Sequence, residues 1–547
     1  MDNSPSVNTT HGGSKENFKP FIPMPRLRQA LLSELILILV AQLIIELVYF
    51  MLGVRMDIYP ILGYWQLVDP LLLKTDLLRS VFYFHIQPPG FNLLIGVILK
   101  LFPSSYALVL QAFHFVLGIT ALWSIFELQL RFKVPRPLAL FLTITFGASP
   151  GYILFEHHTL YTFLVATLWT TSALILHNYL MSRRFRWLLA FFTLIWFLAW
   201  TRALVHIVYV ILILTLIWYK IRPISWKQAV AAIVLVIMVL VPYAKNYAVF
   251  GKFTQSTWFP GNLAKVVLFP IAFQKRLKLY HNKVISKYSA FIWQPDPKKK
   301  VESSQDEAFP TYVDERGNPF WSSPKFLKQF SYLPRIPVLI SYKKSTSTKN
   351  NDMPNPNYVA MIGSYDKVMK DDIKVAIMYP NVVLTSWLYS FLIYFTPSHI
   401  QEYLSSDNKK AAAPMIGLYD RLYGKVRVPA LHDMALWLKA HWDYVPFINP
   451  HHIYIILLFG LPLVLLLGIR MYRHMQEGPD RTLLLYVLVT VLFVMLIGNL
   501  ADCGENNRFR FNSDFFYVFL TGLAITPLVQ KITSYLRPSR KNVQNRD

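Results

Sequence analysis

Cysteine is almost absent from this chain of 547 residues. Cys503 is the only one, and a disulfide needs two, so neither an internal disulfide nor a cysteine-based metal site can form. Charged residues are also scarce. Asp, Glu, Lys and Arg together make up 16% of the chain, against about 25% in an average soluble domain. Together with a hydrophobic content of 54%, this composition predicts a polytopic membrane protein.

Several catalytic signatures are missing as well. The sequence contains neither the Walker glycine pattern nor the dinucleotide-binding one. It has no Gly-x-Ser-x-Gly nucleophile elbow and no His-Glu-x-x-His zinc motif. These absences argue against a nucleotide-hydrolysing pump, a serine hydrolase of that type and a zinc metalloprotease.

Acidic residues are outnumbered by basic ones, 30 against 55, which leaves a formal net charge of +25. In a soluble protein this excess would suggest nucleic acid. In a membrane protein, Lys and Arg gather in cytoplasmic loops and near anionic headgroups. We therefore interpret the charge as a topology signal and expect membrane lipids, and no nucleic acid, as partners.

The apolar runs and the basic loops together predict the membrane topology. Residues 1–32 are polar, and we expect a disordered cytoplasmic tail followed by an uncleaved signal anchor. About ten transmembrane helices place every basic loop inside, with both termini cytoplasmic. The predicted spans are 33–54, 106–130, 137–153, 160–180, two within 187–219, 228–247, 452–470, 482–499 and 514–533.

The expected fold class is mainly α, a polytopic helical membrane protein with interfacial helices and a mixed α/β outer domain. Short apolar segments at 71–84 and 91–102 are expected to lie in the outer interface. The predicted units are 33–249, a transmembrane module with a catalytic first outer loop at 55–92; 250–450, an outer domain with an interfacial helix near 381–396; 451–535, the C-terminal transmembrane helices; and 536–547, a basic cytoplasmic tail.

The first outer loop carries the leading catalytic candidates. A carboxylate in a half-apolar loop can act as a general base, and Asp69 is the first choice, with Asp57 second. Asp69 precedes Pro70, so it can equally cap a short helix. Asp57 can equally be an interface residue. His85 and Gln87 belong to a rigid His-x-Gln-Pro-Pro-Gly turn whose role can be purely structural.

Ionisable residues at membrane depth usually line a polar cavity, and we expect the following residues to bind substrate. Arg202 and His206 are four apart, so a helix would place them on one face. Arg508 and Arg510 are two apart and would point the same way in an extended segment. Snorkelling or an ordinary charged loop are the alternatives. The substrate-binding candidates are His85, Gln87, Glu156, His157, His158, Arg202, His206, Lys245, Glu505, Arg508 and Arg510.

The order of these motifs resembles that of the C-class glycosyltransferases, such as protein mannosyltransferases and aminoarabinose transferases. About half of the chain carries the resemblance. The matching features are His-x-Gln-Pro-Pro-Gly at 85–90, the basic turn at 131–136, Ser149, Pro150 and Glu156, the Thr-Arg break at 201–202, the segment 246–262 and Glu-x-x-Arg-x-Arg at 505–510. Many members have two adjacent acidic residues in the first loop, whereas Asp69 here is followed by Pro70.

The resemblance implies transfer of a sugar from a polyprenyl- or dolichyl-phosphate donor to a glycan, lipid or protein acceptor on the outer face, with inversion. Asp69 would be the base, and Arg202, Arg508, Arg510 and Lys245 would stabilise the phosphate. No cofactor is implied with certainty, and a divalent cation stays open. Adjacent histidines such as His157 and His158 do not by their spacing imply a chelate.

Two other classes stay open. A transporter or lipid flippase would use the same charges as a substrate path, although no inverted repeat is visible. A non-catalytic subunit of an assembly is the third. The region 250–450 has no Asn-x-Ser/Thr sequon, which favours a bacterial inner membrane over the endoplasmic reticulum. The sequence does not identify the sugar, the acceptor or the oligomeric state.

Overall fold

A computed structural model gives the fold, and the description covers residues 24–64, 66–220, 223–292, 336–340, 355–442 and 451–536. Helices dominate this part of the chain. The long ones are α1 (Met24–Leu52), α6 (Tyr106–Arg131), α9 (Tyr161–Ser182), α12 (Trp226–Phe250), α17 (Ala360–Met378), α23 (Pro479–Leu500) and α24 (Asn506–Leu536).

Shorter helices complete the fold. They are α2 (Tyr59–Gly63), α3 (Pro70–Thr75), α4 (Leu77–Tyr83), α5 (Gly90–Leu101), α7 (Arg136–Gly147), α8 (Pro150–Glu156), α10 (Phe185–Thr201), α11 (Ile207–Lys220), α13 (Phe259–Val267), α14 (Phe273–His281), α15 (Lys287–Ala290), η2 (Pro337–Leu339), α18 (Pro380–Tyr394), η3 (Ser398–Ile400), α19 (Ser406–Ala411), α20 (Ala413–Leu422), α21 (Pro429–Trp442), η4 (Ile456–Gly460) and α22 (Leu461–His474).

Seven described helices are long and apolar enough to cross a bilayer, or nine if each of two bent helix pairs is one span. The protein is therefore a multi-pass membrane protein by its helices. The predicted count of ten is not confirmed. The predicted span 137–153 corresponds to α7 and α8, which are bent by 58°. The two spans predicted in 187–219 are α10 and α11, with 17 and 14 residues.

The mixed α/β outer domain is not confirmed either. The regular secondary structure described between 250 and 450 is helical except for β1 (Lys425–Arg427), which pairs antiparallel with β2 (His452–Tyr454). The predicted interfacial helix at 381–396 corresponds to α18, which is bent by 102° relative to α17. The tails at 1–23 and 537–547 and the stretches at 293–335 and 341–354 lie outside the described residues.

Helix α9 is the centre of the bundle and packs against α6, α10, α23 and α24. Several of its polar residues are buried and hydrogen-bonded to neighbouring helices, a kind of contact that helps hold helices together in a membrane. The Trp169 indole donates to the Tyr209 hydroxyl at 3.0 Å, and that hydroxyl lies 2.9 Å from Thr490 Oγ1. Ser172 and Tyr486 share a hydrogen bond of 2.7 Å. These bonds connect α9 to α11 and α23.

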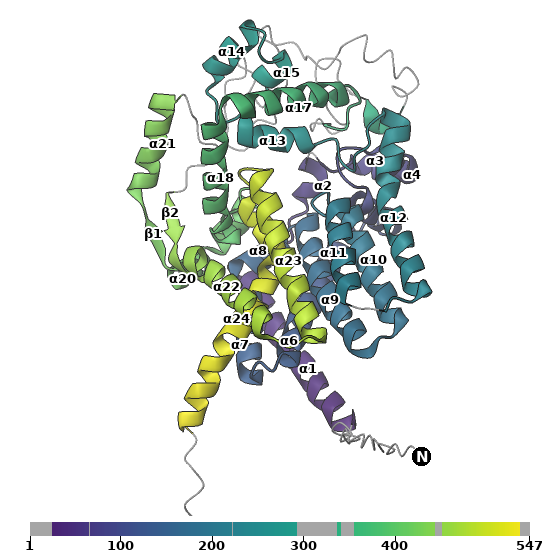
Figure 1. Cartoon of the computed structure of the whole chain (residues 1–547), viewed down its shortest axis with the longest axis vertical. Coiled ribbons are helices and arrows are strands. Elements are labelled where there is room, and N and C mark those ends of the chain that lie inside the picture. Colours follow the sequence, from purple (N-terminus) through teal and green to yellow (C-terminus); the bar gives the residue numbers. More distant parts are fainter. Residues whose placement is uncertain are drawn as a thin grey trace, which may run out of the picture.

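The loop after α1, predicted to lie on the outer face, folds as short helices, α2 to α5. Helix α5 can approach the end of α10 because it begins with Gly90. A Cβ there would lie 2.7 Å from the carbonyl oxygen of Trp200. Figure 1 shows α13 and α17 running across one end of the bundle, opposite the end from which the start of α1 projects. The candidate site lies beneath these two helices.

Candidate functional site

A cavity of about 410 Å³ lies where α10 breaks into α11, opposite the turn between α23 and α24. Helix α10 ends at Thr201 and α11 begins at Ile207, so residues 202–206 form an open segment. The polar residues lining the cavity are Gln66, Gln87, Tyr161, Arg202, His206, Thr254, Gln255, Ser256, Asn262, Asp502, Glu505 and Arg508. One part of the wall is apolar and includes Val208, Phe493 and Ile497.

Arg202 is the most unusual group in this wall. Its side chain is buried, and Nη1 has no hydrogen-bond partner in the described part of the chain. The guanidinium carbon lies 4.6 Å from the ring centre of Tyr161 and 4.8 Å from that of Phe509. Aromatic faces hold a guanidinium in place but do not neutralise it. Arg202 therefore presents a positive charge to the cavity, with Nη1 free of any hydrogen bond in the described part of the chain.

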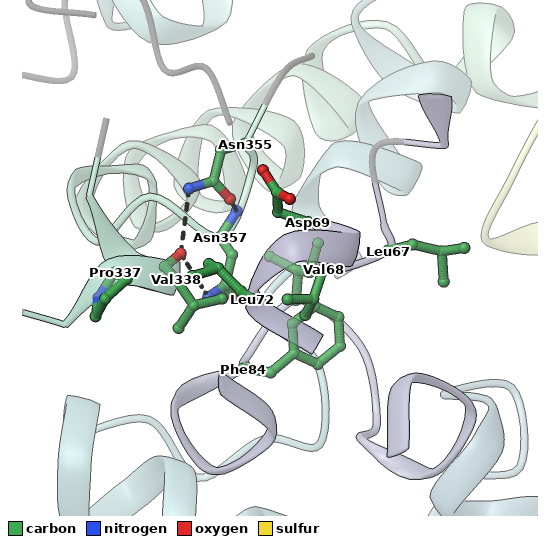
Figure 2. A pocket seen from close by; sticks show the side chains of 10 residues that line it. Leu67, Val68, Asp69, Leu72, Phe84, Pro337, Val338, Asn355 and Asn357 are labelled. Atoms are coloured by element: carbon green, nitrogen blue, oxygen red, sulfur yellow. Dashed lines mark hydrogen bonds between the residues drawn. The ribbon is translucent and has the colours of Figure 1, made fainter. Parts of the chain in front are cut away.

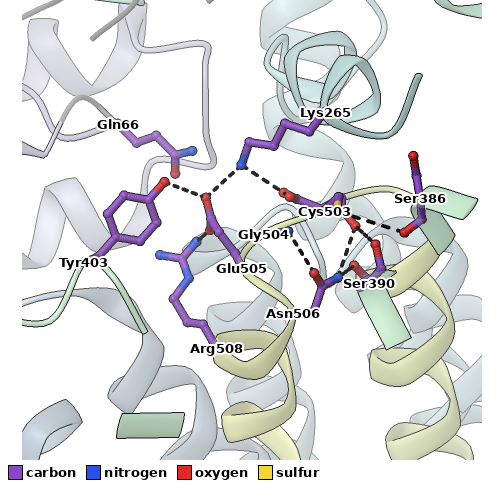
Figure 3. Close-up of polar contacts among 12 residues, drawn as sticks. Gln66, Lys265, Ser386, Ser390, Tyr403, Cys503, Gly504, Glu505, Asn506 and Arg508 are labelled. Carbon is purple, nitrogen blue, oxygen red and sulfur yellow. Dashed lines mark hydrogen bonds and ion pairs between the residues drawn. The ribbon is translucent and has the colours of Figure 1, made fainter. Parts of the chain in front are cut away.

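A second arginine in the wall is paired. Figure 3 shows Arg508 in an ion pair with Glu505. The Glu505 carboxylate also accepts hydrogen bonds from the Lys265 ammonium and the Tyr403 hydroxyl. Lys265 Nζ lies 2.9 Å from Glu505 Oε1, and the Tyr403 hydroxyl donates to the same oxygen at 3.0 Å. Glu505 thus orients Arg508. Lys265 comes from α13, so this network also connects the overlying helix to the site.

Two carboxylates in this network have pKa values shifted in opposite directions. Burial raises the pKa of Asp502 to about 7, although Lys265 opposes the shift from 3.3 Å away. Burial also disfavours the ionised form of Glu505, but Arg508 and Lys265 outweigh it and lower its pKa to about 2. Asp502 is therefore able to accept a proton near neutral pH, while Glu505 stays ionised.

Asp69 does not line this cavity. Its carboxylate accepts a hydrogen bond of 2.8 Å from Leu71 N and caps α3, with Pro70 in the first turn. The capping interpretation is thus confirmed. Asp69 also borders a pocket of about 10 Å³, close to the size of one water molecule. Figure 2 shows Asp69 beside Asn355 in that pocket.

Asp57 and the polar residues at the end of α8, Glu156, His157 and His158, also lie outside the cavity wall. Asp57 Oδ2 lies 2.9 Å from His158 Nδ1, and Asp57 N donates to the carbonyl of His157 at 2.7 Å. His157 Nε2 lies 3.3 Å from Glu46 Oε2. Glu156 is buried between α1 and α6. These contacts join the first outer loop to the turn between α8 and α9.

His85 and Lys245 both make contacts that hold the loop after α1 in place. His85 is fully buried, with Nδ1 2.7 Å from Thr257 Oγ1 and Nε2 3.0 Å from the carbonyl of Asn357. Lys245 donates to the carbonyl of Phe84. Neither residue lines the cavity. The structural role considered for His85 agrees with these bonds, because they connect the loop to segments 172 and 272 residues away.

The stability of the protein should depend on pH through His85. Burial lowers the pKa of His85 to about 3, with a contribution from Lys245, so the folded state excludes the proton that the unfolded chain accepts. The contribution of His85 to the free energy of unfolding is complete above about pH 6.5. It is lost as the pH falls toward 3, by about 1.4 kcal/mol per pH unit. Unfolding of wild type and His85→Gln in detergent, at pH 7 and pH 5, should show the steeper loss in wild type. Parallel losses would contradict it.

Arg510 corrects a sequence expectation. Arg508 and Arg510 lie on helix α24, so a spacing of two sends them in different directions. Arg508 reaches the cavity, whereas Arg510 bonds to Asp514 at 2.8 Å, to the carbonyls of Tyr394 and Thr396, and to Ser398 Oγ. All of these partners lie outside the cavity wall. Arg510 therefore stabilises the packing of α24 against the end of α18.

Arg202 and His206 also reach the cavity for a different reason than predicted. They do not share a helix face, because the break between α10 and α11 separates them. Arg202 has extended backbone angles of φ −143° and ψ 132°. Of the sequence candidates, the cavity thus brings together Gln87, Arg202, His206, Glu505 and Arg508.

Sequence reasoning missed Asp502, Lys265 and the tyrosines around Arg508. Asp502 stands three residues before Glu505 in the same short turn, which was a usable signal. Lys265 follows the segment 246–262 but belongs to a region expected to be a separate outer domain. The Tyr64 hydroxyl accepts from Arg508 at 3.2 Å, and nothing in its sequence context indicates this contact.

The described residues contain no group of three His, Cys, Asp or Glu side chains that could hold a metal ion.

The helices and the cavity define a polytopic membrane protein with a charged site at one end of its bundle. No protein-family profile matches the chain, and a search of curated proteins gave no match. Among solved structures, the chain is similar to the Archaeoglobus fulgidus oligosaccharyltransferase, which was crystallised with a tethered acceptor peptide containing an Asn-Val-Thr sequon. The identity is 11% and the TM-score 0.39, over 92% of this chain and 51% of that one. The chain thus spans about half the length of that protein, and at this TM-score the likeness carries no argument.

Proposed function

We propose that the protein is an integral-membrane glycosyltransferase that moves a sugar from a polyprenyl- or dolichyl-phosphate donor to an acceptor on the outer face, with inversion. The observation that carries the proposal is the buried guanidinium of Arg202, whose Nη1 has no hydrogen-bond partner in the described chain. It lines a cavity that also contains a carboxylate with a pKa near neutrality. A bacterial inner membrane is the proposed location.

An anion is the ligand that this charge arrangement favours. A buried charge without a partner costs several kcal/mol, and a phosphate oxygen would complete the hydrogen bonds of Arg202. Arg508 stands in the same wall, and its Nε has no partner in the described chain. Two guanidinium groups can therefore contact one phosphate diester.

The apolar wall supports a lipid-linked donor. Val208 is 60% exposed and Ile497 is 41% exposed, so the cavity wall continues onto the apolar surface of α11 and α23. An isoprenoid chain could lie along this surface while its phosphate contacts Arg202. The amide groups of Gln66, Gln87 and Asn262 would face the sugar hydroxyls on the polar side.

The transfer step then needs one base and no strong acid. An acceptor hydroxyl attacks the anomeric carbon, Asp502 takes the hydroxyl proton, and the bond between that carbon and the phosphate oxygen breaks. The electron pair stays on the phosphate, whose developing charge Arg202 and Arg508 stabilise. Asp69 and Asp57, which the family resemblance favours, are the competing bases, and a divalent cation would be an additional requirement.

The test is release of free polyprenyl phosphate from a panel of lipid-phosphate sugars by purified wild type in nanodiscs. Turnover of one donor, with the sugar recovered on an added acceptor, is the expected result. Tight binding of the donors without turnover would favour the transporter or subunit alternatives. Neither binding nor turnover with any donor would contradict the proposal.

A further inference from the structure

Lys265 lies behind the cavity wall and contacts both acidic residues of the turn between α23 and α24. Its ammonium nitrogen lies 3.3 Å from Asp502 Oδ1 and 2.9 Å from Glu505 Oε1. The Lys265 side chain is 5% exposed, and it is not among the residues that line the cavity, whereas Asp502 and Glu505 are. Lys265 therefore contacts the acidic residues of the site and not the space that a substrate would fill.

The two carboxylates are not equally supplied with hydrogen-bond donors. Glu505 lies between Lys265 and Arg508 (Figure 3), and it also accepts from the Tyr403 hydroxyl. The Asp502 carboxylate is bonded to Lys265, and the described residues give it no second hydrogen-bond partner. Loss of Lys265 would leave Glu505 with two donors and the Asp502 carboxylate with none. Lys265 therefore matters more to Asp502 than to Glu505.

The charge of Lys265 opposes two effects that favour a protonated Asp502. Burial raises the pKa of Asp502 most, Lys265 lowers it, Glu505 raises it by repulsion and Arg508 lowers it, with about 7 as the result. Burial lowers the pKa of Lys265, but Asp502 and Glu505 outweigh the burial and raise it, so Lys265 stays charged. Without this ammonium group, a buried carboxyl beside an ionised Glu505 would keep its proton above neutral pH. A protonated carboxyl cannot serve as a general base.

We propose that Lys265 is a positioning residue for the transfer step, which from helix α13 keeps the Asp502 carboxylate ionised and fixed in the cavity wall. The inference rests on the proposed function, in which Asp502 accepts the proton of the acceptor hydroxyl. Helix α13 packs against α17 and α18. The docking of this overlying layer on the bundle would thus determine whether Asp502 can act as a base.

The experiment compares the pH dependence of turnover in wild type and in Lys265→Met, which removes the charge but keeps a long side chain. The measured quantity is the pH at which the rate reaches half of its plateau, expected at about 7 in wild type. It should increase by about 1–3 pH units in Lys265→Met, the usual effect of an opposite charge at this distance. Lys425→Met is the matched control, because Lys425 pairs with Asp420 at 2.8 Å outside the cavity wall. Its half-maximal pH should equal that of wild type.

A merely structural role would lower kcat or the unfolding midpoint of Lys265→Met without moving the half-maximal pH, and this result would overturn the proposal. If Lys265→Met fails to fold, Glu505→Gln and the double variant Lys265→Met/Glu505→Gln take its place, since the double variant removes one charge of each sign. The half-maximal pH of Glu505→Gln should be lower than that of wild type, and that of the double variant higher than that of Glu505→Gln. Equal values in these two variants would also overturn the proposal.

Infrared difference spectra recorded against pH, without donor, separate this inference from the proposed function. The carboxyl band that disappears in Asp502→Asn follows the protonation of Asp502 in the absence of turnover. If this band titrates at a higher pH in Lys265→Met while wild type consumes no donor, Lys265 controls Asp502 and only the transferase proposal fails. If the band titrates at the same pH in both proteins, the role of Lys265 is overturned whatever the activity.

Discussion

Replacing Arg202 with alanine is expected to lower kcat for polyprenyl phosphate release by about 10²–10³-fold, the range for removing one donor to a developing oxyanion. The reason is that Arg202 lines the cavity with a buried positive charge whose Nη1 has no hydrogen-bond partner in the described chain. Arg202→Lys should recover part of the loss, since lysine keeps the charge but not the planar fork. Initial rates at saturating donor measure the effect.

Arg79→Ala is the matched control for this change. Arg79 is about half exposed and lies 4.0 Å from Asp76, and an exposed ion pair contributes little. Its kcat should stay within about 2-fold of wild type. Full activity in a folded Arg202→Ala protein would show that the phosphate is held elsewhere.

Replacing Asp502 with asparagine is expected to lower kcat by about 10²–10⁴-fold, the usual contribution of a general base. The pH dependence is the sharper readout. Burial raises the pKa of Asp502 to about 7, and only the ionised form accepts a proton. The wild-type rate should therefore increase through pH 7 to a plateau above it, and the Asp502→Asn protein should lack this limb.

Two further variants identify the base. Asp69→Asn and Asp57→Asn should retain most activity if Asp502 accepts the proton. Asp407→Asn is the control for the substitution itself, because its side chain is 87% exposed. Loss of turnover in Asp69→Asn alone, with an unchanged unfolding midpoint, would move the base to the first outer loop. If the rise of the rate through pH 7 is unchanged in Asp502→Asn, Asp69→Asn and Asp57→Asn, none of these three residues is the general base.

The helical part of the fold could be predicted because long apolar segments have few alternatives in a bilayer, where backbone groups must bond within the segment. The break after Thr201 and the short helix after Pro70 were equally accessible, because an arginine and a proline mark them locally. The number of transmembrane spans could not be predicted in the same way, because α10 and α11 are short and α7 and α8 are bent relative to each other. The outer region has weak patterns, and its described part folds as helices.

The site was predicted only in part, for a geometric reason. Arg508 and Arg510 have the same sequence context, yet one reaches the cavity and the other bonds to Asp514 and the end of α18. Both arginines lie on α24, and on a helix a spacing of two turns their side chains to different sides. Similarly, Asp69 and Asp502 are both acidic residues in outer turns. Only the packing of α23 and α24 against the break at Arg202 gives Asp502 a place in the cavity.

By itself, the sequence determined that this chain is a helical membrane protein, where its charges gather, and which local turns interrupt its helices. These properties depend on transfer energies and on neighbours along the chain. Only the tertiary structure decided which polar residues share a cavity, because Lys265 and Glu505 are 240 positions apart and their meeting depends on how α13 covers the bundle. The same packing placed Glu156 against Gly118, outside the cavity to which its sequence motif had assigned it.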